Sequence, residues 1–237
     1  MPVLTGATRV ETSDRGRDSL LRRVLTPKPS FVLNRENDTV RAGVEAFVAE
    51  RFQSAWQARV TQFFPLLLSM HCLGCCTAVA GIRPAAGNAL FLERYLDTNA
   101  EVALGACIGE AVPRAQLAEI GNLVAGQRGA SHLLFLVFTA ALHRGGYRWI
   151  VFTATRALRK NLDGLGYPMR TLAPASADRL DPSARMEWGT YYDSGPLVMA
   201  GSLDDAMRLI AARPLLRRVL RLYRATIAEL AAGLEQP

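Results

Sequence analysis

Glu119 is the residue whose type and setting best fit proton-transfer chemistry. It lies within residues 117–124, a run that is otherwise apolar apart from Gly121 and Asn122. Partial burial raises the pKa of a carboxyl group, and such a carboxylate can take a proton from an attacking group. The alternative is an ion pair with Arg83 or Arg114 that serves only stability, because structural ion pairs also perturb carboxylates. The sequence leaves both alternatives open.

A glycine-containing loop follows at residues 126–131, which read Gly-Gln-Arg-Gly-Ala-Ser. An apolar helical run comes next at 132–142, and β-branched and aromatic residues at 147–153 predict a buried strand. The loop therefore opens a helix, whose unpaired N–H groups attract phosphate. Gly129 lets the backbone approach an anion closely, and Arg128 adds positive charge. The competing interpretation is an ordinary connection between a strand and a helix.

Cysteines form a second candidate site. Cys72, Cys75 and Cys76 are close in sequence, and His71 stands beside them. A zinc site would want a second cysteine pair or suitably spaced histidines. The cluster lies in an apolar run, where cysteine behaves as a small buried apolar residue. We therefore predict no metal site.

Hydrophobic periodicity and the positions of Gly and Pro predict the elements that hold these groups. Asp38 and Asn88 are predicted caps of helices at 38–59 and 89–96. The other predictions are a strand at 31–33, strands within 66–82 with a bend near Gly74, a helix or strand at 102–112, a helix at 155–165, a strand at 169–173, a loop at 174–186, a strand or hairpin at 188–200, and helices at 203–212 and 215–234.

Composition and charge limit the class of protein. The chain has 237 residues and is 50% hydrophobic, which suits one main domain. The net charge of +7 favours anionic partners without choosing among phosphorylated cofactors, nucleic acid and anionic lipid. Arginines in residues 215–234 form an amphipathic pattern that suits peripheral contact with anionic lipid or a solvated helix face. No export signal or spanning segment is evident, which predicts a cytoplasmic protein.

Six segments together resemble the thermostable hemolysin family. They are Gly81-Ile-Arg-Pro, Leu90-Phe-Leu-Glu-Arg-Tyr-Leu, Glu119-Ile-Gly-Asn-Leu, Trp149-Ile-Val-Phe-Thr-Ala-Thr, Leu165-Gly and Trp188-Gly-Thr-Tyr-Tyr. They extend over residues 31–201, and their order and number carry the match. That family is in turn similar to the GNAT superfamily of N-acyltransferases, and within it to the acyl-homoserine-lactone synthases.

This resemblance implies a GNAT-like α/β (α+β) fold of three layers, with a mixed, mainly antiparallel central sheet flanked by helices. We expect a flexible leader at residues 1–29, the GNAT-like domain at 30–202 and a C-terminal helical extension at 203–237. The implied activity moves an acyl group from coenzyme A or acyl carrier protein to a small amine. The acyl carrier is a co-substrate, no cofactor is bound covalently, and we expect no nucleic-acid partner.

The resemblance also implies roles for single residues. Two neighbouring strands diverge, and the edge of one binds the pantetheine arm of the carrier. The implied carrier-binding residues are Asn122, Val124, Gly126, Arg128, Gly129 and Ser131. Glu119 is the implied general base and Glu93 a second acidic candidate, while Arg83 binds a substrate carboxylate. Trp188 and Tyr191 line an acyl pocket, unless they only pack in the core.

One position departs from the pattern. Many GNAT enzymes carry a tyrosine that protonates the leaving thiolate, and Leu162 stands at that position here. Either the thiolate leaves unassisted, or another residue serves, or the fold has lost the chemistry. The alternatives to the enzyme are accordingly a haemolytic, membrane-active factor and an inactive GNAT-fold binding module.

Overall fold

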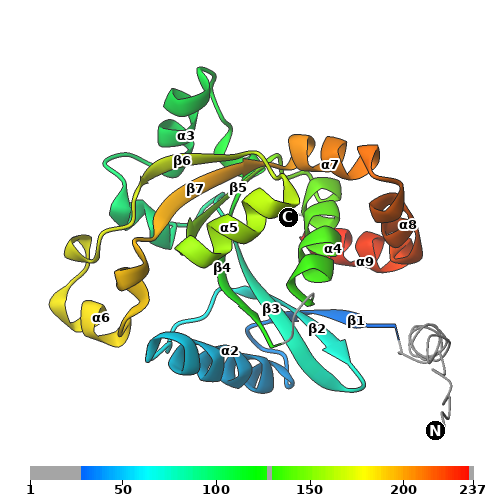
Figure 1. The fold of residues 1–237 in the computed structure, drawn as a ribbon, viewed down its shortest axis with the longest axis horizontal. Helices are drawn as coiled ribbons and strands as arrows, with labels where there is room; N and C mark the ends of the chain where they lie inside the picture. Colours follow the sequence, from blue (N-terminus) through cyan, green and yellow to red (C-terminus); the bar gives the residue numbers. More distant parts are fainter. Residues whose placement is uncertain (1–27, 127–129, 235–237) are drawn as a thin grey trace, which may run out of the picture.

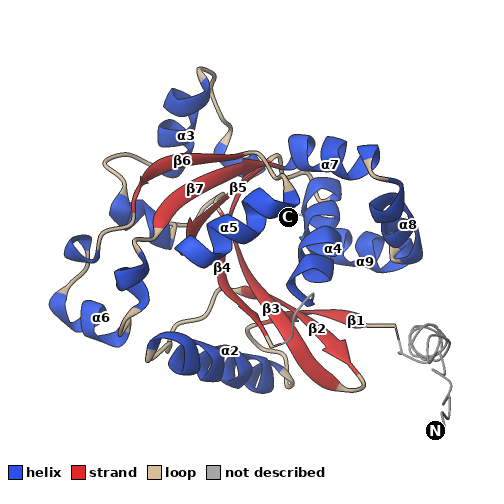
Figure 2. Ribbon diagram, in the orientation of Figure 1, coloured by secondary structure: helices blue, strands red, loops and turns tan. Residues whose placement is uncertain are grey.

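The computed structural model describes residues 28–126 and 130–234, and a central sheet organises them (Figures 1 and 2). Its seven strands follow the order β1-β2-β3-β4-β5-β7-β6. They are β1 (Ser30–Arg35), β2 (Leu66–Cys72), β3 (Cys75–Pro84), β4 (Leu117–Ala125), β5 (Trp149–Ala154), β6 (Met169–Pro174) and β7 (Leu197–Ser202). Among these, β4 and β5 pair in parallel and the other neighbours pair antiparallel. The predicted mixed, mainly antiparallel sheet is confirmed.

Helices cover both faces of the sheet. The α-helices are α2 (Arg41–Trp56), α3 (Ala100–Ile108), α4 (Ala130–Arg144), α5 (Arg156–Leu165), α6 (Pro182–Glu187), α7 (Leu203–Ala212), α8 (Pro214–Leu222) and α9 (Arg224–Leu234). The 3-10 helices are η1 (Phe91–Tyr95), η2 (Arg114–Gln116), η3 (Ala177–Arg179) and η4 (Tyr191–Ser194). One face packs on α4, α5, α7 and α9, and the other packs on α2, η1 and α3. The three expected layers are present.

The strands β4 and β5 diverge towards their C-terminal ends. Their pairing runs from Leu117 opposite Trp149 to Ile120 opposite Phe152, although both strands continue further. In the same region the register between β3 and β4 shifts, because β4 holds one extra residue, and Asn122 adopts a φ of 45°. Such a bulge bends a strand and increases its twist. The bend opens a wedge between β4 and β5 (Figure 1).

Both predicted helix caps are wrong. Helix α2 begins at Arg41, and the Asp38 carboxylate instead accepts the N–H of Arg35. Asn88 donates to the carbonyls of Pro84 and Ala86, and η1 starts later. Both side chains satisfy backbone groups in preceding turns, which is the usual local alternative to capping.

The segment before β7 also differs from its prediction. Residues 174–186 contain η3 and most of α6, which starts with Pro182 at its first turn. Residues 188–193 form turns and η4 rather than a strand, and Gly189 and Gly195 there have positive φ. The predicted helix at 215–234 is divided at Tyr223, whose ring packs edge-on against Phe31.

The cysteine cluster lies at the β2–β3 hairpin. Cys75 is exposed and Cys72 and Cys76 are half-buried, so the prediction that the clustered cysteines are small buried residues is wrong. The hairpin turn at Leu73 and Gly74, both with positive φ, carries the cluster to the surface. Within residues 28–126 and 130–234, no group of three His, Cys, Asp or Glu residues is placed to hold a metal ion.

Candidate active site

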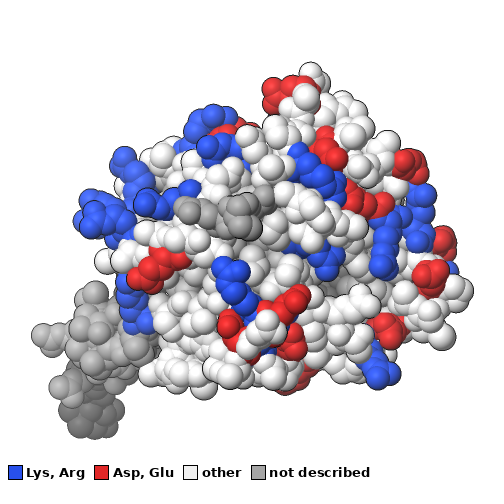
Figure 3. All heavy atoms as spheres, turned by 180° about the vertical axis from the view of Figure 1, so that it is seen from behind, with Lys and Arg blue, Asp and Glu red and all other residues white. Residues whose placement is uncertain are grey.

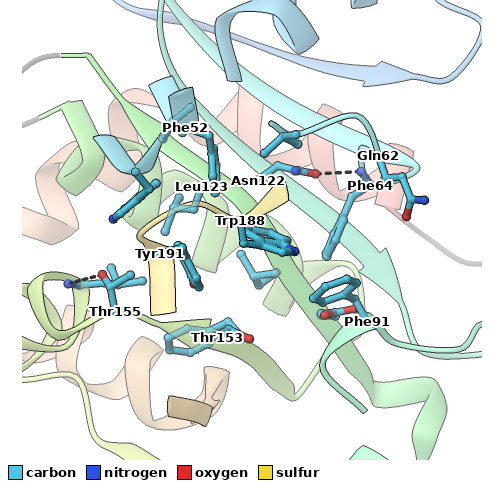
Figure 4. Close-up of a pocket in the computed structure, with 18 of the residues that line it drawn as sticks. Phe52, Gln62, Phe64, Phe91, Asn122, Leu123, Thr153, Thr155, Trp188 and Tyr191 are labelled. Carbon is cyan, nitrogen blue, oxygen red and sulfur yellow. Dashed lines mark hydrogen bonds between the residues drawn. The ribbon is translucent and has the colours of Figure 1, made fainter. Parts of the chain in front are cut away.

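A cavity of about 390 Å³ lies where β4 and β5 diverge. Its walls come from β4 and β5, from α2 and α5, from η1, and from the segment between α6 and β7. Figure 4 shows side chains from these distant segments around one space. The aromatic lining residues are Phe52, Trp56, Phe64, Phe91, Tyr95, Phe135, Phe152, Trp188, Tyr191 and Tyr192. A concave, mainly apolar site with a few polar groups is typical of small-molecule binding.

Trp188 and Tyr191, predicted as an acyl-pocket wall, both lie on this cavity. Their rings pack at 5.1 Å between centroids, and each also packs against Phe52 of α2. Trp56, one helical turn after Phe52, stands 5.3 Å from Tyr191. The two rings of α2 were predicted only as part of a helix, because their partners lie more than a hundred residues later in the chain. These rings therefore pack on one another and also line the cavity.

Glu119 is buried in the cavity wall, with 3% of its surface exposed. Its Oε2 accepts the N–H of Phe91 at 2.8 Å, and its Oε1 accepts the N–H of Leu92 at 2.9 Å. Burial raises the pKa of the Glu119 carboxyl to about 7, although these N–H groups and Arg83 oppose the rise. A carboxyl with this pKa can both accept and release a proton near neutral pH.

Arg83 lies opposite Glu119 in the β3–β4 register. Its Nη1 is 3.6 Å from Glu119 Oε2, and its guanidinium stands 4.4 Å above the Phe64 ring. That separation is longer than a good hydrogen bond, so the pair leaves guanidinium N–H groups for another partner. The ion pair that the sequence offered as an alternative is therefore formed, with Arg83 and not with Arg114.

Glu93 does not face the cavity. Its carboxylate accepts the N–H groups of Leu90 and Ala100, each at 2.9 Å, and pairs with Arg114 at 2.7 Å. Burial acts to raise its pKa, but Arg114 and the two N–H groups outweigh burial and lower it. Arg114 also pairs with Glu101 of α3. This ionised carboxylate ties η1 to α3, which is a structural role.

The carrier-binding candidates of β4 occupy the wedge. Asn122 Oδ1 accepts the Phe64 N–H at 2.8 Å, so this side chain fixes the backbone of Phe64 (Figure 4). The Phe64 ring in turn lies against the guanidinium of Arg83. Val124 is buried and lines the cavity. Beyond Ile120 the β4 residues have no β5 residue opposite them. The described part of β4 therefore offers an open strand edge to an extended ligand.

Only some of the predicted carrier-binding residues in the loop after β4 lie within the described residues. Gly126 donates its N–H to the Thr77 carbonyl at 2.8 Å, so this amide is already engaged. Arg128 and Gly129 lie outside the described residues. Ser131 is in the first turn of α4, and its side chain is likewise not described.

The structure adds Arg51 of α2 to the carrier side. A Cβ on Gly126 would lie 3.3 Å from Arg51 Nη2, so the guanidinium stands beside the end of β4. Its Nε is buried and has no hydrogen-bond partner among the described residues, and the guanidinium lies 5.1 Å from the Phe47 ring centre. Helical periodicity alone gave no sign of this residue, because the partner segment lies far along the chain.

Leu162 of α5 is buried in the main core, and its hydrocarbon side chain has no proton to donate. Other hydroxyl groups face the cavity, among them those of Tyr95 and Tyr192, which bond to each other at 2.5 Å. Burial raises the pKa of both tyrosines, so both hydroxyls hold their protons at neutral pH. The cavity therefore contains proton donors other than the expected tyrosine.

Comparisons with known proteins identify the family and the fold of the chain. A family model described as thermostable hemolysin matches residues 34–207, which is most of the chain. The chain belongs to the thermostable hemolysin family. The match to this hemolysin model ends within α7, so α8 and α9 lie beyond it. None of the curated proteins matches the chain in sequence.

Solved structures share the fold of this hemolysin-family chain at low identity. TofI in an apo form has a TM-score of 0.51 and 12% identity, covering 79% of this chain and 99% of its own. The AHL synthase LasI has a TM-score of 0.50 and 13% identity, covering 74% and 90%. FeeM, an N-acyl amino acid synthase from uncultured soil microbes, has a TM-score of 0.53 and 12% identity, covering 80% and 98%. The fold is GNAT-like, as the sequence resemblance implied.

Proposed function

We propose that this protein is an acyltransferase that moves an acyl group from the thioester of coenzyme A or acyl carrier protein to a small amine. The observation that carries the proposal is Glu119, a carboxyl with a pKa of about 7 on the wall of the cavity between diverging strands. The fold shared with an AHL synthase and an N-acyl amino acid synthase supports it.

The carrier arm occupies the wedge in this proposal. An extended pantetheine chain hydrogen-bonds along the open edge of β4, as a strand would. Its phosphate end lies towards Arg51 and the N-terminus of α4, a helix of 15 residues. The first N–H groups of a helix have no partner within the helix and attract anions. The carrier then places its thioester in the cavity beside Glu119.

The acyl chain and the acceptor bind different parts of the cavity, one apolar and one polar. The aromatic wall of Phe52, Trp188 and Tyr191 suits an apolar acyl chain. Arg83 stands beside Glu119 with part of its guanidinium available. A carboxylate on the acceptor can bind Arg83 and so hold its amine near Glu119.

Proton transfer then follows from the geometry. The amine nitrogen bonds to the thioester carbonyl carbon, and its proton passes to Glu119 directly or through a water. The bond between carbon and sulfur breaks, and the thiolate leaves. An ordinary thiol has a pKa of about 8.5, so the thiolate is a tolerable leaving group. The protonated Glu119 returns its proton to the sulfur, directly or relayed through the hydroxyls of the Tyr95–Tyr192 pair.

Free-thiol release with acyl-coenzyme A or acyl carrier protein and a panel of amino acids tests the proposal. Glu119→Gln keeps the side-chain shape but removes the base, so the rate should fall about a hundredfold to ten-thousandfold. Glu93→Gln is the matched control, because that carboxylate clamps η1 to α3 away from the cavity. Raising the pH should partly restore Glu119→Gln, because more of the amine is then neutral. Equal rates in the wild type and Glu119→Gln would remove Glu119 from the mechanism.

The second candidate function is a binding module without turnover, which Leu162 favours. In that case the protein still binds a carrier, measured by calorimetric titration, but releases no thiol with any donor and acceptor tested. Carrier binding without thiol release therefore selects the binding module, and thiol release selects the enzyme.

A further inference from the structure

Helix α8 presents a basic surface that the proposed reaction does not use. Residues 206–228 contain six arginines and no acidic residue. Arg217, Arg218, Arg221 and Arg224 are all exposed, and none forms an ion pair with a described residue. Lys28 adds to this end of the molecule, because its Nζ donates to the Leu222 carbonyl at 2.7 Å.

Large apolar side chains are exposed on the same helix. Leu215 and Leu222 are 70% and 69% exposed. They stand seven residues apart, so they project from nearly the same side of the helix, and Arg218 lies between them. A neighbouring side of the helix packs inward, where Val219 and Leu220 contact the main core, and Tyr223, just after the helix, is buried. Packing therefore explains one side of α8 and leaves the leucines in solvent.

Helix α8 lies away from the cavity between β4 and β5. The helix lies at the right-hand edge of the molecule in Figure 1. In Figure 3, seen from behind, Lys and Arg side chains gather at the left edge, where the helix lies in that view. No residue of α8 lines the cavity between β4 and β5. This surface is therefore separate from the candidate active site.

We propose that α8 is a docking surface for an anionic phospholipid bilayer. Arginine side chains bind lipid phosphates, while leucines beside them enter the boundary between headgroups and acyl chains. An acidic protein or a nucleic acid would use the arginines but gives no reason for two exposed leucines at a seven-residue spacing. Within the described ranges, no helix is both long and apolar enough to cross a membrane. The contact is therefore peripheral and reversible by salt.

Flotation of the full-length protein with lipid vesicles tests the proposal. The probes are vesicles of phosphatidylcholine alone and vesicles that also contain phosphatidylglycerol. We expect flotation with the second kind and little with the first, and added salt should reverse it. Each arginine near an anionic surface contributes about fivefold in partitioning, so Arg217→Gln, Arg218→Gln and Arg221→Gln combined should weaken it by about a hundredfold.

A matched control removes the same charge elsewhere. Arg144, Arg156 and Lys160 are exposed on α4 and α5, and replacing all three by Gln gives the same net charge as the α8 variant. This control should float as the wild type does. Equal loss in both triple variants would mean that net charge alone matters and would overturn the proposal.

The leucines separate a bilayer from other anionic partners. Leu215→Ser and Leu222→Ser keep every charge but remove the apolar contact, and each should weaken partitioning by about tenfold. Unchanged flotation of the double variant would show that charge alone draws the protein to the vesicles, which would overturn the proposed insertion of the leucines and the argument that prefers a bilayer to other anionic partners. No flotation of the wild type with phosphatidylglycerol vesicles would overturn the proposal outright. Because these side chains are exposed, melting temperatures should stay near that of the wild type, which separates lost binding from unfolding.

Discussion

At the level of single residues, the Glu119 carboxyl holds two backbone N–H groups of η1 and faces Arg83, and it also lines the cavity. The N–H groups and Arg83 favour the ionised form, whereas burial favours the neutral form. Burial outweighs them and brings the pKa to about 7. A structural tie and a general base are therefore compatible in this one side chain, because each carboxylate oxygen has more than one acceptor site.

The raised pKa also predicts how stability depends on pH. A carboxyl with a higher pKa in the folded than in the unfolded protein holds its proton more tightly when folded. The contribution of Glu119 is thus complete below its ordinary pKa of 4.5 and is lost as the pH rises to about 7. We expect the wild type to lose free energy of unfolding relative to Glu119→Gln across this interval, measured by urea unfolding at several pH values.

For Glu93→Gln, the same measurement should show the opposite dependence of stability on pH. The pKa of Glu93 is lowered, so its contribution is present above 4.5 and is lost as the pH falls. The free energy of unfolding of the wild type should therefore increase relative to that of Glu93→Gln as the pH rises towards neutral. A difference between the wild type and Glu119→Gln that stays constant with pH would show that the pKa of Glu119 is not raised.

At the level of elements, the bulged part of β4 helps to position the polar groups of the cavity wall. Asn122 fixes the Phe64 backbone, and the Phe64 ring lies over Gly121 and under Arg83. A Cβ on Gly121 would lie 2.5 Å from the end of that ring. Glycine at this position therefore lets Phe64 hold Arg83 beside Glu119.

A double-mutant cycle tests this arrangement. Gly121→Ala should displace the Phe64 ring and destabilise the protein by about 1–3 kcal/mol, as overpacked cores do. In a Phe64→Leu background the added methyl has more room, so the same change should cost less. Thermal unfolding of the four proteins measures the coupling between the two positions. Additive losses would show that Gly121 and Phe64 act independently.

At the level of the whole molecule, the C-terminal helices belong to the same core as the sheet. Tyr223, Ile227, Leu230 and Leu234 join the cluster that contains the apolar face of α4, and α9 also contacts β1. The described part of the expected C-terminal extension, residues 203–234, therefore packs in the same core as the sheet. The basic face of α8 remains on the outside of this core.

Truncation after Ala212 tests how far the core depends on α8 and α9. Removing them would expose the apolar sides of α4 and β1 to water, so we expect a melting temperature many degrees lower or aggregation. Deletion of residues 1–27 is the comparison, because the sequence predicts a flexible leader there; this deletion should leave the melting temperature nearly unchanged. A truncated chain that melts like the wild type would show that α8 and α9 are an independent addition.

The sequence by itself determined the order of most strands and helices and the place of the carboxylate in β4, because local periodicity and glycine positions encode such features. Only the tertiary structure decided which arginine faces Glu119, that Glu93 is a clamp, and that Arg51 stands at the end of β4. It also decided that η1 meets Glu119 through its N–H groups and that two rings of α2 share a wall with Trp188 and Tyr191. These contacts join segments far apart in the chain, and their selection depends on how the sheet twists and where β4 bends. A single sequence shows local preferences, but it does not show which distant side chains the folded sheet brings together.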